Sequence, residues 1–331
     1  MNKVIKLKNR PVGAPQNSDF EFTKEDTPSP KDGELLLEAR YVSVDPYLRG
    51  RMMDQKSYIE PFKLNEPITS GIVAEVIESK NENFKKGDIV NGMLAWKEQQ
   101  TSNGEGLNKV DADKAPLSAY LGVLGLTGLT AYFGLTKLGL PKEGDTLVVS
   151  GAAGAVGTIV GQIGKIHGCK VIGIAGSDEK VEMLKSKFGY DAAINYNTTD
   201  DMTSAIAEVA PDGVDVFFDN VGGTIFDAVL ANIARNAHVV LCGAIADYNK
   251  TETPTGPRVN TTLIKNSVSM SGFTLGDFQS DFQEGIQKLA GWLSEGKLEY
   301  EETIVEGFDN IPQAFLDLFE GKNKGKMVVK I

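Results

Sequence analysis

A glycine-rich segment between two runs of regular structure restricts the folds open to this chain. Gly151, Gly154 and Gly157 occupy this segment. It follows the apolar run Thr146–Ser150, and helical spacing begins near Ala155. Glycine permits a tight turn and lets the backbone approach another group closely. A strand, a glycine turn and a helix in this order predict the first part of a βαβ unit.

The alternation of strands and helices continues beyond this first unit. We expect strands at Thr146–Ser150, Lys170–Ala175, Ala192–Asn195, Val214–Asp219, His238–Leu241 and Ser267–Gly272. We expect helices to begin near Ala155, Asp178, Met202 and Thr224. Apolar strands separated by helices favour a parallel sheet that helices cover on both faces. The predicted fold class is α/β, with a doubly wound parallel sheet of the Rossmann type over residues 121–296.

Residues 1–120 have a different pattern, in which short apolar runs are separated by turn residues. The runs at 34–39, 71–77 and 88–92 are bounded by Gly, Pro, Asp or Asn. This pattern is typical of a compact, barrel-like module of antiparallel strands. A chain of 331 residues is also longer than one hydrophobic core usually organises, so two domains are expected.

The remaining segments connect or complete these two domains. Helical spacing predicts a helix over Ala119–Leu138 that enters the second domain. Amphipathic helices are expected at Phe282–Gly296 and Ile311–Glu320. The last strand, residues 325–331, is expected to return to the first domain, so that residues 297–331 complete it.

The composition disfavours several classes of partner. A formal net charge of -11 disfavours duplex nucleic acid, which needs a basic face on the protein. No apolar run reaches the ~18 residues that span a bilayer, and residues 1–10 lack a secretory signal, so we expect a cytoplasmic protein without a membrane partner.

Cys169, Cys242, His167 and His238 are the only soft metal ligands. A zinc site needs about three or four such ligands in one place, so no metal is expected.

The glycine segment also predicts a ligand. The start of the following helix presents unpaired N–H groups and the positive end of the helix dipole, and both suit a pyrophosphate. We therefore expect the backbone between Gly151 and Gly157 to bind a dinucleotide. Glycines that serve only helix–strand packing are the alternative explanation of the pattern.

The end of the second expected strand indicates which dinucleotide is bound. A unit that prefers NAD normally has Asp or Glu there, to hold the ribose 2′-hydroxyl. Here Gly176 and Ser177 end the strand, and Asp178 has the position of a helix-start residue. Lys180 follows within one helical turn and suits a 2′-phosphate, so NADP(H) is the expected cofactor. A solvated helix face is the other interpretation of Lys180.

Two further strand ends are candidates for the same site, because ligands of doubly wound sheets lie beyond the carboxyl ends of the strands. Asn220 follows the strand that ends at Asp219, and its alternative role is that of a turn residue. Cys242, Gly243 and Ala244 follow the next strand. Their backbone is expected to line the nicotinamide pocket, unless they form only a close-packed strand end.

Several motifs in order resemble one family. They are Val42–Arg51, Tyr120–Phe133, Gly151–Gly157, Gly176–Lys180, Phe218–Gly223, Cys242–Asn249 and Asn323–Lys326. With them the chain resembles the zinc-independent medium-chain dehydrogenases/reductases of the leukotriene B4 dehydrogenase, or prostaglandin reductase, branch, which includes curcumin-reductase-like and alkenal double-bond reductases. The resemblance implies a GroES-like catalytic domain plus a Rossmann domain, a homodimer, and NADPH-dependent reduction of the C=C bond of α,β-unsaturated aldehydes or ketones.

The resemblance also implies the residues that contact the cofactor. Lys180 and Tyr196 match the positions that hold the 2′-phosphate. The pyrophosphate positions match Gly154, Ala155, Val156 and Gly157. Further cofactor contacts match Asn220, Cys242, Gly243, Ala244, Ile245, Tyr248, Phe273, Thr274, Leu275 and Asn323.

In such a reduction, hydride reaches the β-carbon and negative charge develops on the carbonyl oxygen, where a fixed donor lowers the barrier most. We expect Tyr58, Tyr248 and Tyr47 to be the candidate catalytic donors, although each tyrosine also suits packing at a domain boundary. Two other functions stay open. One is an NADPH:quinone oxidoreductase of the same superfamily, and the other is a non-catalytic NADPH-binding protein.

Overall fold

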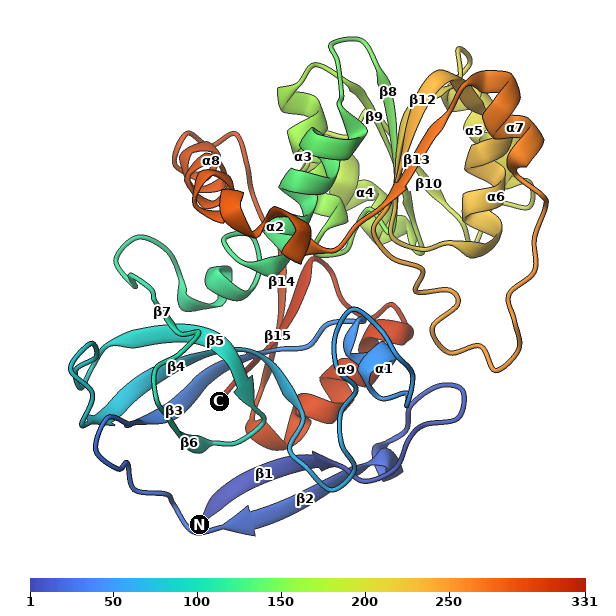
Figure 1. Ribbon diagram of the computed structural model, residues 1–331. Helices are drawn as coiled ribbons and strands as arrows, with labels where there is room; N and C mark the ends of the chain where they lie inside the picture. Colours follow the sequence, from blue (N-terminus) through green and yellow to red (C-terminus); the bar gives the residue numbers. More distant parts are fainter. The chain divides into compact units, whose positions relative to one another are not determined.

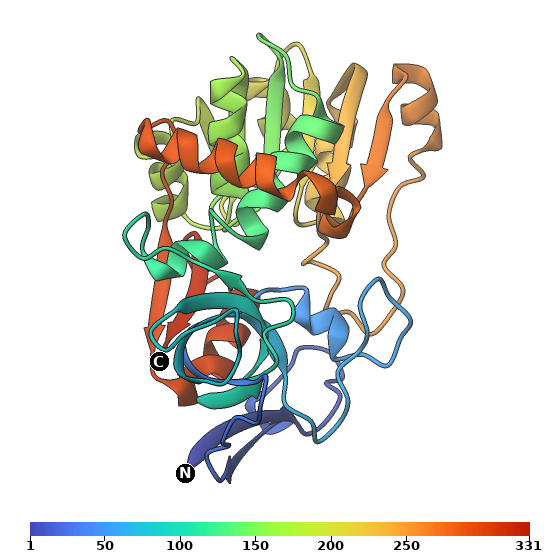
Figure 2. The same cartoon turned by 60° about the vertical axis from the view of Figure 1, so that its left-hand side comes forward.

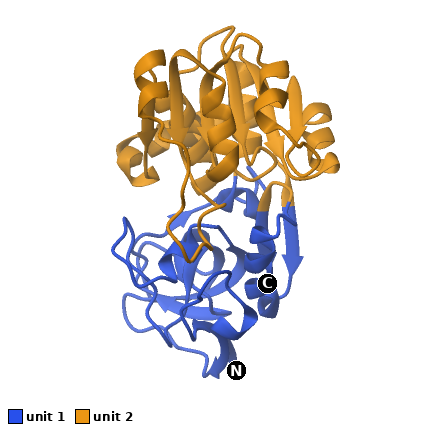
Figure 3. Ribbon diagram, turned by 90° about the vertical axis from the view of Figure 1, so that its right-hand side faces the viewer, with its two compact units in different colours: residues 1–122, 303–323, 327–331 blue, residues 123–302, 324–326 orange.

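The computed structural model describes residues 1–331 and divides into two compact units (Figure 1). Unit 1 contains residues 1–122, 303–323 and 327–331, and unit 2 contains residues 123–302 and 324–326 (Figure 3). Residues 297–302 and 324–326 therefore pack with unit 2, whereas the sequence predicts them in the first domain. The Gln162 side chain explains part of this difference, because it exchanges two hydrogen bonds of 2.7 and 2.9 Å with the Glu299 backbone.

Unit 2 is built around a six-stranded sheet in the order β10-β9-β8-β11-β12-β13. Its strands are β8 (Thr146–Ser150), β9 (Lys170–Ala175), β10 (Ala192–Asn195), β11 (Val214–Asp219), β12 (Ile233–Leu241) and β13 (Ser269–Gly272). Every neighbouring pair is parallel. The strand order runs outward in one direction from β8 and in the other from β11. This is the doubly wound arrangement, and it confirms the predicted α/β fold class.

Helices cover both faces of this sheet. The helices of unit 2 are α2 (Leu126–Phe133), α3 (Gly157–Ile166), α4 (Asp178–Ser186), α5 (Met202–Val209), α6 (Gly223–Ala231), α7 (Asn260–Asn266) and α8 (Phe282–Ser294). Figure 1 and Figure 2 show α3 and α4 on one face and α5 and α6 on the other. Ile172, Phe217 and Val229 belong to the buried core between sheet and helices. No helix of the chain is at once long and apolar enough to cross a membrane.

The helix predicted over Ala119–Leu138 is wrong, because the chain forms three shorter pieces there. They are a 3₁₀ helix at Leu117–Leu121, α2, and a π-helical segment at Gly134–Gly139. Gly122 and Gly125 separate the first two pieces, with φ/ψ of -116°/-110° and -128°/-145°. A Cβ at Gly128 would lie 1.8 Å from the Val123 carbonyl oxygen. The glycines in this segment therefore allow backbone turns and close packing instead of one continuous helix.

Two strand boundaries also differ from the prediction. β12 begins at Ile233 instead of His238, and it includes Asn236 in a left-handed conformation with φ +60°. This irregularity interrupts the apolar pattern that marks the strand in the sequence. β13 begins at Ser269 instead of Ser267, because Ser267 ends α7 with φ +54°.

Unit 1 is the β-rich unit and confirms the predicted GroES-like domain. Its strands are β1 (Asn2–Leu7), β2 (Phe20–Glu25), β3 (Leu35–Ser43), β4 (Thr69–Ser79), β5 (Ile89–Ala95), β6 (Gln99–Ser102), β7 (Asn108–Lys109), β14 (Glu302–Glu306) and β15 (Lys326–Lys330). β1 and β2 form a separate antiparallel pair, whereas the large sheet has the order β14-β15-β3-β4-β5-β7, with β6 on β3. The helices α1 (Leu48–Arg51) and α9 (Ile311–Phe319) contribute to its core, with Trp96 fully buried.

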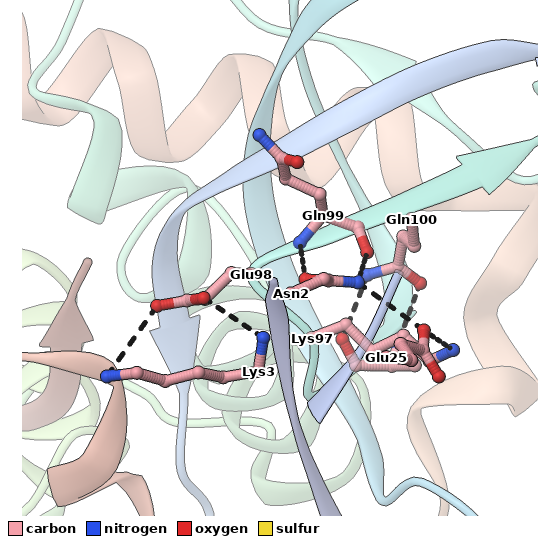
Figure 4. A network of polar contacts seen from close by, with 8 residues as sticks. Asn2, Lys3, Glu25, Lys97, Glu98, Gln99 and Gln100 are labelled. Carbon is pink, nitrogen blue, oxygen red and sulfur yellow. Dashed lines mark hydrogen bonds and ion pairs between the residues drawn. The ribbon is translucent and has the colours of Figure 1, made fainter. Parts of the chain in front are cut away.

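A polar network fastens β1 to the segment that leads into β6 (Figure 4). The Asn2 side-chain amide donates to the Gln99 carbonyl over 2.6 Å and accepts the Gln99 N–H over 2.8 Å. The Lys3 N–H donates to the Glu98 carboxylate over 3.0 Å, and the Lys3 ammonium group pairs with Asp309 at 2.8 Å. These side chains connect the β1–β2 pair to the large sheet.

Candidate functional site

The glycine loop turns the chain from β8 into α3 through crowded backbone. Gly151 has a φ of +57°, a left-handed conformation that glycine adopts readily. A Cβ at Gly157 would lie 2.5 Å from the Gly151 carbonyl oxygen and 2.6 Å from Ala152 Cα. α3 begins at Gly157 and not near Ala155 as predicted, so Ala155 and Val156 belong to the loop. Both glycines are therefore required by the backbone itself.

A second glycine segment, from near the end of the chain, pairs with this loop. The Gly325 N–H donates to the Ala153 carbonyl over 2.8 Å, and Gly325 forms a parallel bridge with Gly154. Gly325 has a φ of +60°, and a Cβ there would lie 1.9 Å from the Glu301 carbonyl oxygen. The Lys326 N–H donates to the same carbonyl over 2.9 Å. Residues 324–326 are thus part of the loop's surroundings, a relationship that the sequence motif by itself did not reveal.

Polar side chains join β8 and β11 at the point where the strand order reverses. The Ser150 hydroxyl donates to Asp219 Oδ1 over 2.6 Å, and it accepts the Asn220 N–H over 2.8 Å. The Asn220 side-chain amide donates to the Ser150 carbonyl over 2.7 Å. The N–H groups of Val221 and Gly222 donate to the Asp219 carboxylate. Burial raises the pKa of Asp219, and these hydrogen bonds oppose that shift. Asn220 is thus fixed at the carboxyl edge of the sheet.

The end of β9 itself carries no acid, and the nearest carboxylates belong to the first turn of α4. Ser177 caps the helix, because its hydroxyl accepts the Lys180 N–H over 3.3 Å. Asp178 Oδ1 accepts a 2.7 Å hydrogen bond from the Asn195 side chain, so this acid is held on the helix start. Lys180 is half-buried. Burial lowers the pKa of Lys180, and the nearby ammonium group of Lys324 lowers it further.

Tyr196 reaches the same strand end from the segment after β10. Its N–H donates to the Ala175 carbonyl over 3.0 Å, and 42% of the residue is exposed. A Cβ at Gly176 would lie 2.5 Å from the Tyr196 hydroxyl oxygen. Glycine at this position therefore lets the hydroxyl lie against the backbone that leads to Lys180.

The segment after β12 folds back on the end of β11. The N–H groups of Cys242 and Gly243 both donate to the Asp219 carbonyl, over 2.8 and 3.1 Å. The Ala244 N–H donates to the Tyr248 hydroxyl oxygen over 3.2 Å. A Cβ at Gly243 would also lie 3.2 Å from this hydroxyl oxygen. Burial raises the pKa of the Cys242 thiol to about 12, so this cysteine is no thiolate nucleophile at neutral pH.

Three predicted residues follow β13 at the same edge of the sheet. The Thr274 N–H donates to Asp277 over 2.8 Å, within a capping box that starts a 3₁₀ helix at Leu275–Asp281. The Phe273 ring lies 6.0 Å from the Phe278 ring. The carboxyl ends of parallel strands meet at one edge, so Phe273, Thr274 and Leu275 share that edge with the glycine loop.

The other tyrosine candidates belong to unit 1. Tyr47 precedes α1 and packs against the core of unit 1, whereas Tyr58 is 69% exposed in the loop that follows α1. Arg51 holds this loop: its side chain donates to the Glu60 carbonyl over 3.0 Å and lies 4.0 Å from the Phe62 ring centre. Burial raises the pKa of Tyr47, so its hydroxyl stays a proton donor at neutral pH.

The structure therefore groups most, but not all, of the predicted residues within one unit. Gathered at the carboxyl edge of the unit 2 sheet are Gly154, Ala155, Val156, Gly157, Lys180, Tyr196, Asn220, Cys242, Gly243, Ala244, Ile245, Tyr248, Phe273, Thr274 and Leu275. Tyr47, Tyr58 and Asn323 belong to unit 1. Sequence reasoning missed Ser150 and Asp219, although a polar residue at the end of each of two apolar strands was a usable signal.

Known proteins match both units of the chain. Residues 3–110 match the family described as the N-terminal domain of oxidoreductase, and residues 155–291 match the family described as zinc-binding dehydrogenase. The putative NADP-dependent oxidoreductase YfmJ of Bacillus subtilis is 54% identical over 329 residues, which cover 99% of this chain and 97% of the relative. The NADPH-dependent curcumin reductase of Escherichia coli is 39% identical over 335 residues, with 100% and 97% covered.

A solved structure agrees with these relatives. CurA from Vibrio vulnificus, in complex with NADPH, superimposes with a TM-score of 0.95 at 43% identity, over 99% of this chain and 98% of that one. The chain belongs to the zinc-independent medium-chain dehydrogenase/reductase family. In this reductase, the glycine loop and the ends of β9, β11 and β12 lie at the carboxyl edge of the sheet, which is the edge where doubly wound sheets bind ligands.

The description "zinc-binding dehydrogenase" does not extend to the donor set of this reductase. The structure contains no group of three or more His, Cys, Asp and Glu side chains that could hold a metal ion. Cys169 lies buried before β9, and its thiol contacts the Lys142 carbonyl at 3.5 Å. Cys242 follows β12, which β8 and β11 separate from β9 in the sheet. A zinc ion therefore has no fitting site among these residues.

Proposed function

We propose that this reductase uses NADPH to reduce the C=C bond of α,β-unsaturated aldehydes and ketones. The observation that carries the proposal is the strand end after β9, where Gly176 and Ser177 replace the usual acid. The Tyr196 hydroxyl lies against Gly176, and Lys180 follows in the first turn of α4. A relative supports the reaction class, because it is named an NADPH-dependent curcumin reductase. Curcumin is a conjugated enone.

The residues at the sheet edge fit this cofactor. A side chain at Gly157 would collide with the loop backbone, and Gly151 has a left-handed φ of +57°. The absence of side chains at both positions leaves a backbone surface that a pyrophosphate can approach. We assign the pyrophosphate to the loop from Gly154 to Gly157 and the 2′-phosphate to Lys180 and Tyr196. The remaining contacts proposed for the dinucleotide are Asn220, Cys242 to Tyr248, Phe273 to Leu275 and Asn323.

The substrate requires a hydrogen-bond donor at its carbonyl oxygen. Bound NADPH supplies a hydride for the β-carbon of the conjugated substrate. Charge then develops on the carbonyl oxygen, and a tyrosine O–H fixed at that oxygen stabilises it. Tyr58, on the loop held by Arg51, is our first candidate for this donor. Tyr248 is the second, because the N–H that its oxygen accepts from Ala244 strengthens its own O–H as a donor.

The test is NADPH oxidation by the purified protein with matched substrates. We expect turnover with a conjugated enal or enone and none with the saturated aldehyde or ketone of the same length. NADH should support much slower turnover. The product should retain its carbonyl group and lack the C=C bond, which mass spectrometry and NMR distinguish. Turnover of naphthoquinones without any turnover of enones would replace this proposal with a quinone reductase.

A non-catalytic NADPH-binding protein is the other outcome of this test. That function would follow if NADPH binds saturably but neither enones nor quinones oxidise it.

The proposal also includes the assembly and location of the enzyme. We infer a homodimer, which the open edge of the four-residue strand β13 favours, because an edge strand can pair with another strand. Sedimentation of the purified protein as a monomer at micromolar concentration would contradict it. A cytoplasmic location stays a prediction, which cell fractionation can check.

A further inference from the structure

Lys324 lies at the first turn of α4, although it is far from this helix in the sequence. Its ammonium group pairs with the Glu179 carboxylate, one residue before Lys180. This position is set by the backbone, because the next residue, Gly325, is pinned to the glycine loop by its N–H bond to Ala153 and its bridge to Gly154. The contact between Gly325 and the glycine loop therefore also places Lys324 near the end of β9.

Two ammonium groups consequently face one small region of the surface. Burial lowers the pKa of Lys180, the charge on Lys324 lowers it further, and the Glu179 carboxylate opposes this shift. Like charges that approach each other destabilise the protein unless an anion lies near both. Glu179 supplies only part of that compensation, because 72% of its side chain is exposed and exposed ion pairs stabilise weakly.

The Ser177 and Asp178 side chains nearby are already engaged. Ser177 accepts the Lys180 N–H, and Asp178 accepts the Asn195 side chain. The Tyr196 hydroxyl lies against Gly176. A phosphate that enters this region meets two cations and a hydroxyl, with Glu179 as the competing anion for Lys324.

We infer that Lys324 is a second cation for the 2′-phosphate of NADPH and a specificity-determining residue of this enzyme. The inference rests on the proposed function and deepens it, since neither the glycine motif nor the strand-end pattern assigns Lys324 a role. Lys324 exchanges the Glu179 carboxylate for the phosphate, which carries more negative charge. This exchange favours NADPH over NADH, because NADH has no 2′-phosphate.

Binding measurements test the inference without catalysis. Titration calorimetry with adenosine 2′,5′-bisphosphate and adenosine 5′-monophosphate reports the 2′-phosphate alone, and NADPH and NADH fluorescence reports the whole cofactor. We expect Lys324→Gln to weaken binding of the bisphosphate and of NADPH about five- to tenfold, between the values typical of exposed ion pairs and of charged hydrogen bonds. Binding of the monophosphate and of NADH should not change. Lys324→Arg should retain most of the wild-type affinity.

A matched control comes from the same helix. Lys185 on α4 forms a similarly exposed pair with Glu182, and Lys185→Gln should bind all four ligands like the wild type. Thermal unfolding checks that each variant is folded. The inference is wrong, while the proposed function stands, if folded Lys324→Gln binds the bisphosphate and NADPH like the wild type. It is also wrong if the variant loses as much affinity for NADH as for NADPH. If the wild type itself fails to bind NADPH, the proposed function fails first.

Discussion

The Ser150 hydroxyl donates a 2.6 Å hydrogen bond to the Asp219 carboxylate and so joins β8 to β11 where the strand order reverses. Asp219 is 2% exposed. A carboxylate is buried at such a place only when hydrogen bonds compensate for its lost hydration. This pair therefore fixes Ser150, whose hydroxyl and carbonyl groups hold Asn220 at the carboxyl edge of the sheet.

Removal of the Ser150 hydroxyl should destabilise unit 2. We expect Ser150→Ala to lower the free energy of unfolding by about 1–3 kcal/mol, because Asp219 loses a buried donor. Urea unfolding measures this change. Ser186→Ala is the control, since its hydroxyl donates to the Glu182 carbonyl on the exposed face of α4, and it should cost less than about 0.5 kcal/mol. Equal effects of the two substitutions would remove any special role of Ser150.

An added methyl group at Gly157 should close the loop to a pyrophosphate. The Cβ of Gly157→Ala would lie 2.5 Å from the Gly151 carbonyl oxygen, so the loop must shift and NADPH binding should fall at least about tenfold, which corresponds to about 1.4 kcal/mol. Fluorescence titration measures the loss. Gly291→Ala is the matched control, because nothing lies within 4 Å of its Cβ on α8. It should bind NADPH normally and unfold at the same or a higher temperature. Normal binding by Gly157→Ala would contradict the assigned role of the loop.

The charge on Lys180 should matter for NADPH and not for NADH. A charged hydrogen bond contributes about 1.5–3 kcal/mol, so Lys180→Ala should weaken NADPH binding about 10- to 100-fold. The dissociation constant of NADH should stay nearly unchanged. A parallel loss for both cofactors would instead indicate that the side chain of Lys180 serves packing.

The preference for NADPH should decline as the pH rises. Burial and Lys324 lower the pKa of Lys180 in the free protein, so Lys180 loses its proton at a lower pH than an ordinary lysine, whose pKa is 10.5. The 2′-phosphate is already a dianion above a pH of about 6–7, so the decline comes from the lysine. NADPH affinity should thus fall between neutral pH and pH 10.5, while NADH affinity stays level. Lys180→Arg should keep its charge and remove this dependence. A flat profile for the wild type would argue against Lys180 as the titrating cation.

The two tyrosine candidates can be separated by kinetics. If Tyr58 donates to the substrate carbonyl, Tyr58→Phe should lower kcat about 10- to 100-fold or more with little effect on NADPH binding, because donors at developing oxyanions act in the transition state. Tyr248→Phe should also disturb cofactor binding, because its hydroxyl holds the Ala244 N–H. Tyr120→Phe, whose hydroxyl donates to the Asp111 carbonyl in unit 1, is the control. Unchanged kcat in Tyr58→Phe would transfer the role to Tyr248 or Tyr47.

Local patterns predicted the Rossmann sheet well. The bounds expected for four strands, from Thr146–Ser150 to Val214–Asp219, are confirmed without change. These strands are continuous apolar runs because the sheet buries them on both faces, and turn residues bound each run. The helix starts at Asp178 and Met202 are also confirmed, because Ser177 and Asp201 cap them directly before.

Patterns failed where glycine has several uses. Composition and spacing predict a helix over Ala119–Leu138, but they do not distinguish a glycine inside a helix from one that breaks it. Gly122 and Gly125 adopt non-helical conformations, and Gly128 permits contact with the Val123 carbonyl. Each of these roles depends on what lies opposite the glycine in space.

The sequence by itself determined the alternating order of strands and helices, the glycine turn after β8 and the missing acid after β9, because each depends on neighbours within a few residues. The tertiary structure decided which distant groups complete the edge of the sheet. Gly325 crosses to Ala153, Lys324 reaches Glu179 beside Lys180, and Ser150 meets Asp219. These contacts join residues that are far apart in the chain, and only the packing of the whole unit brings them together.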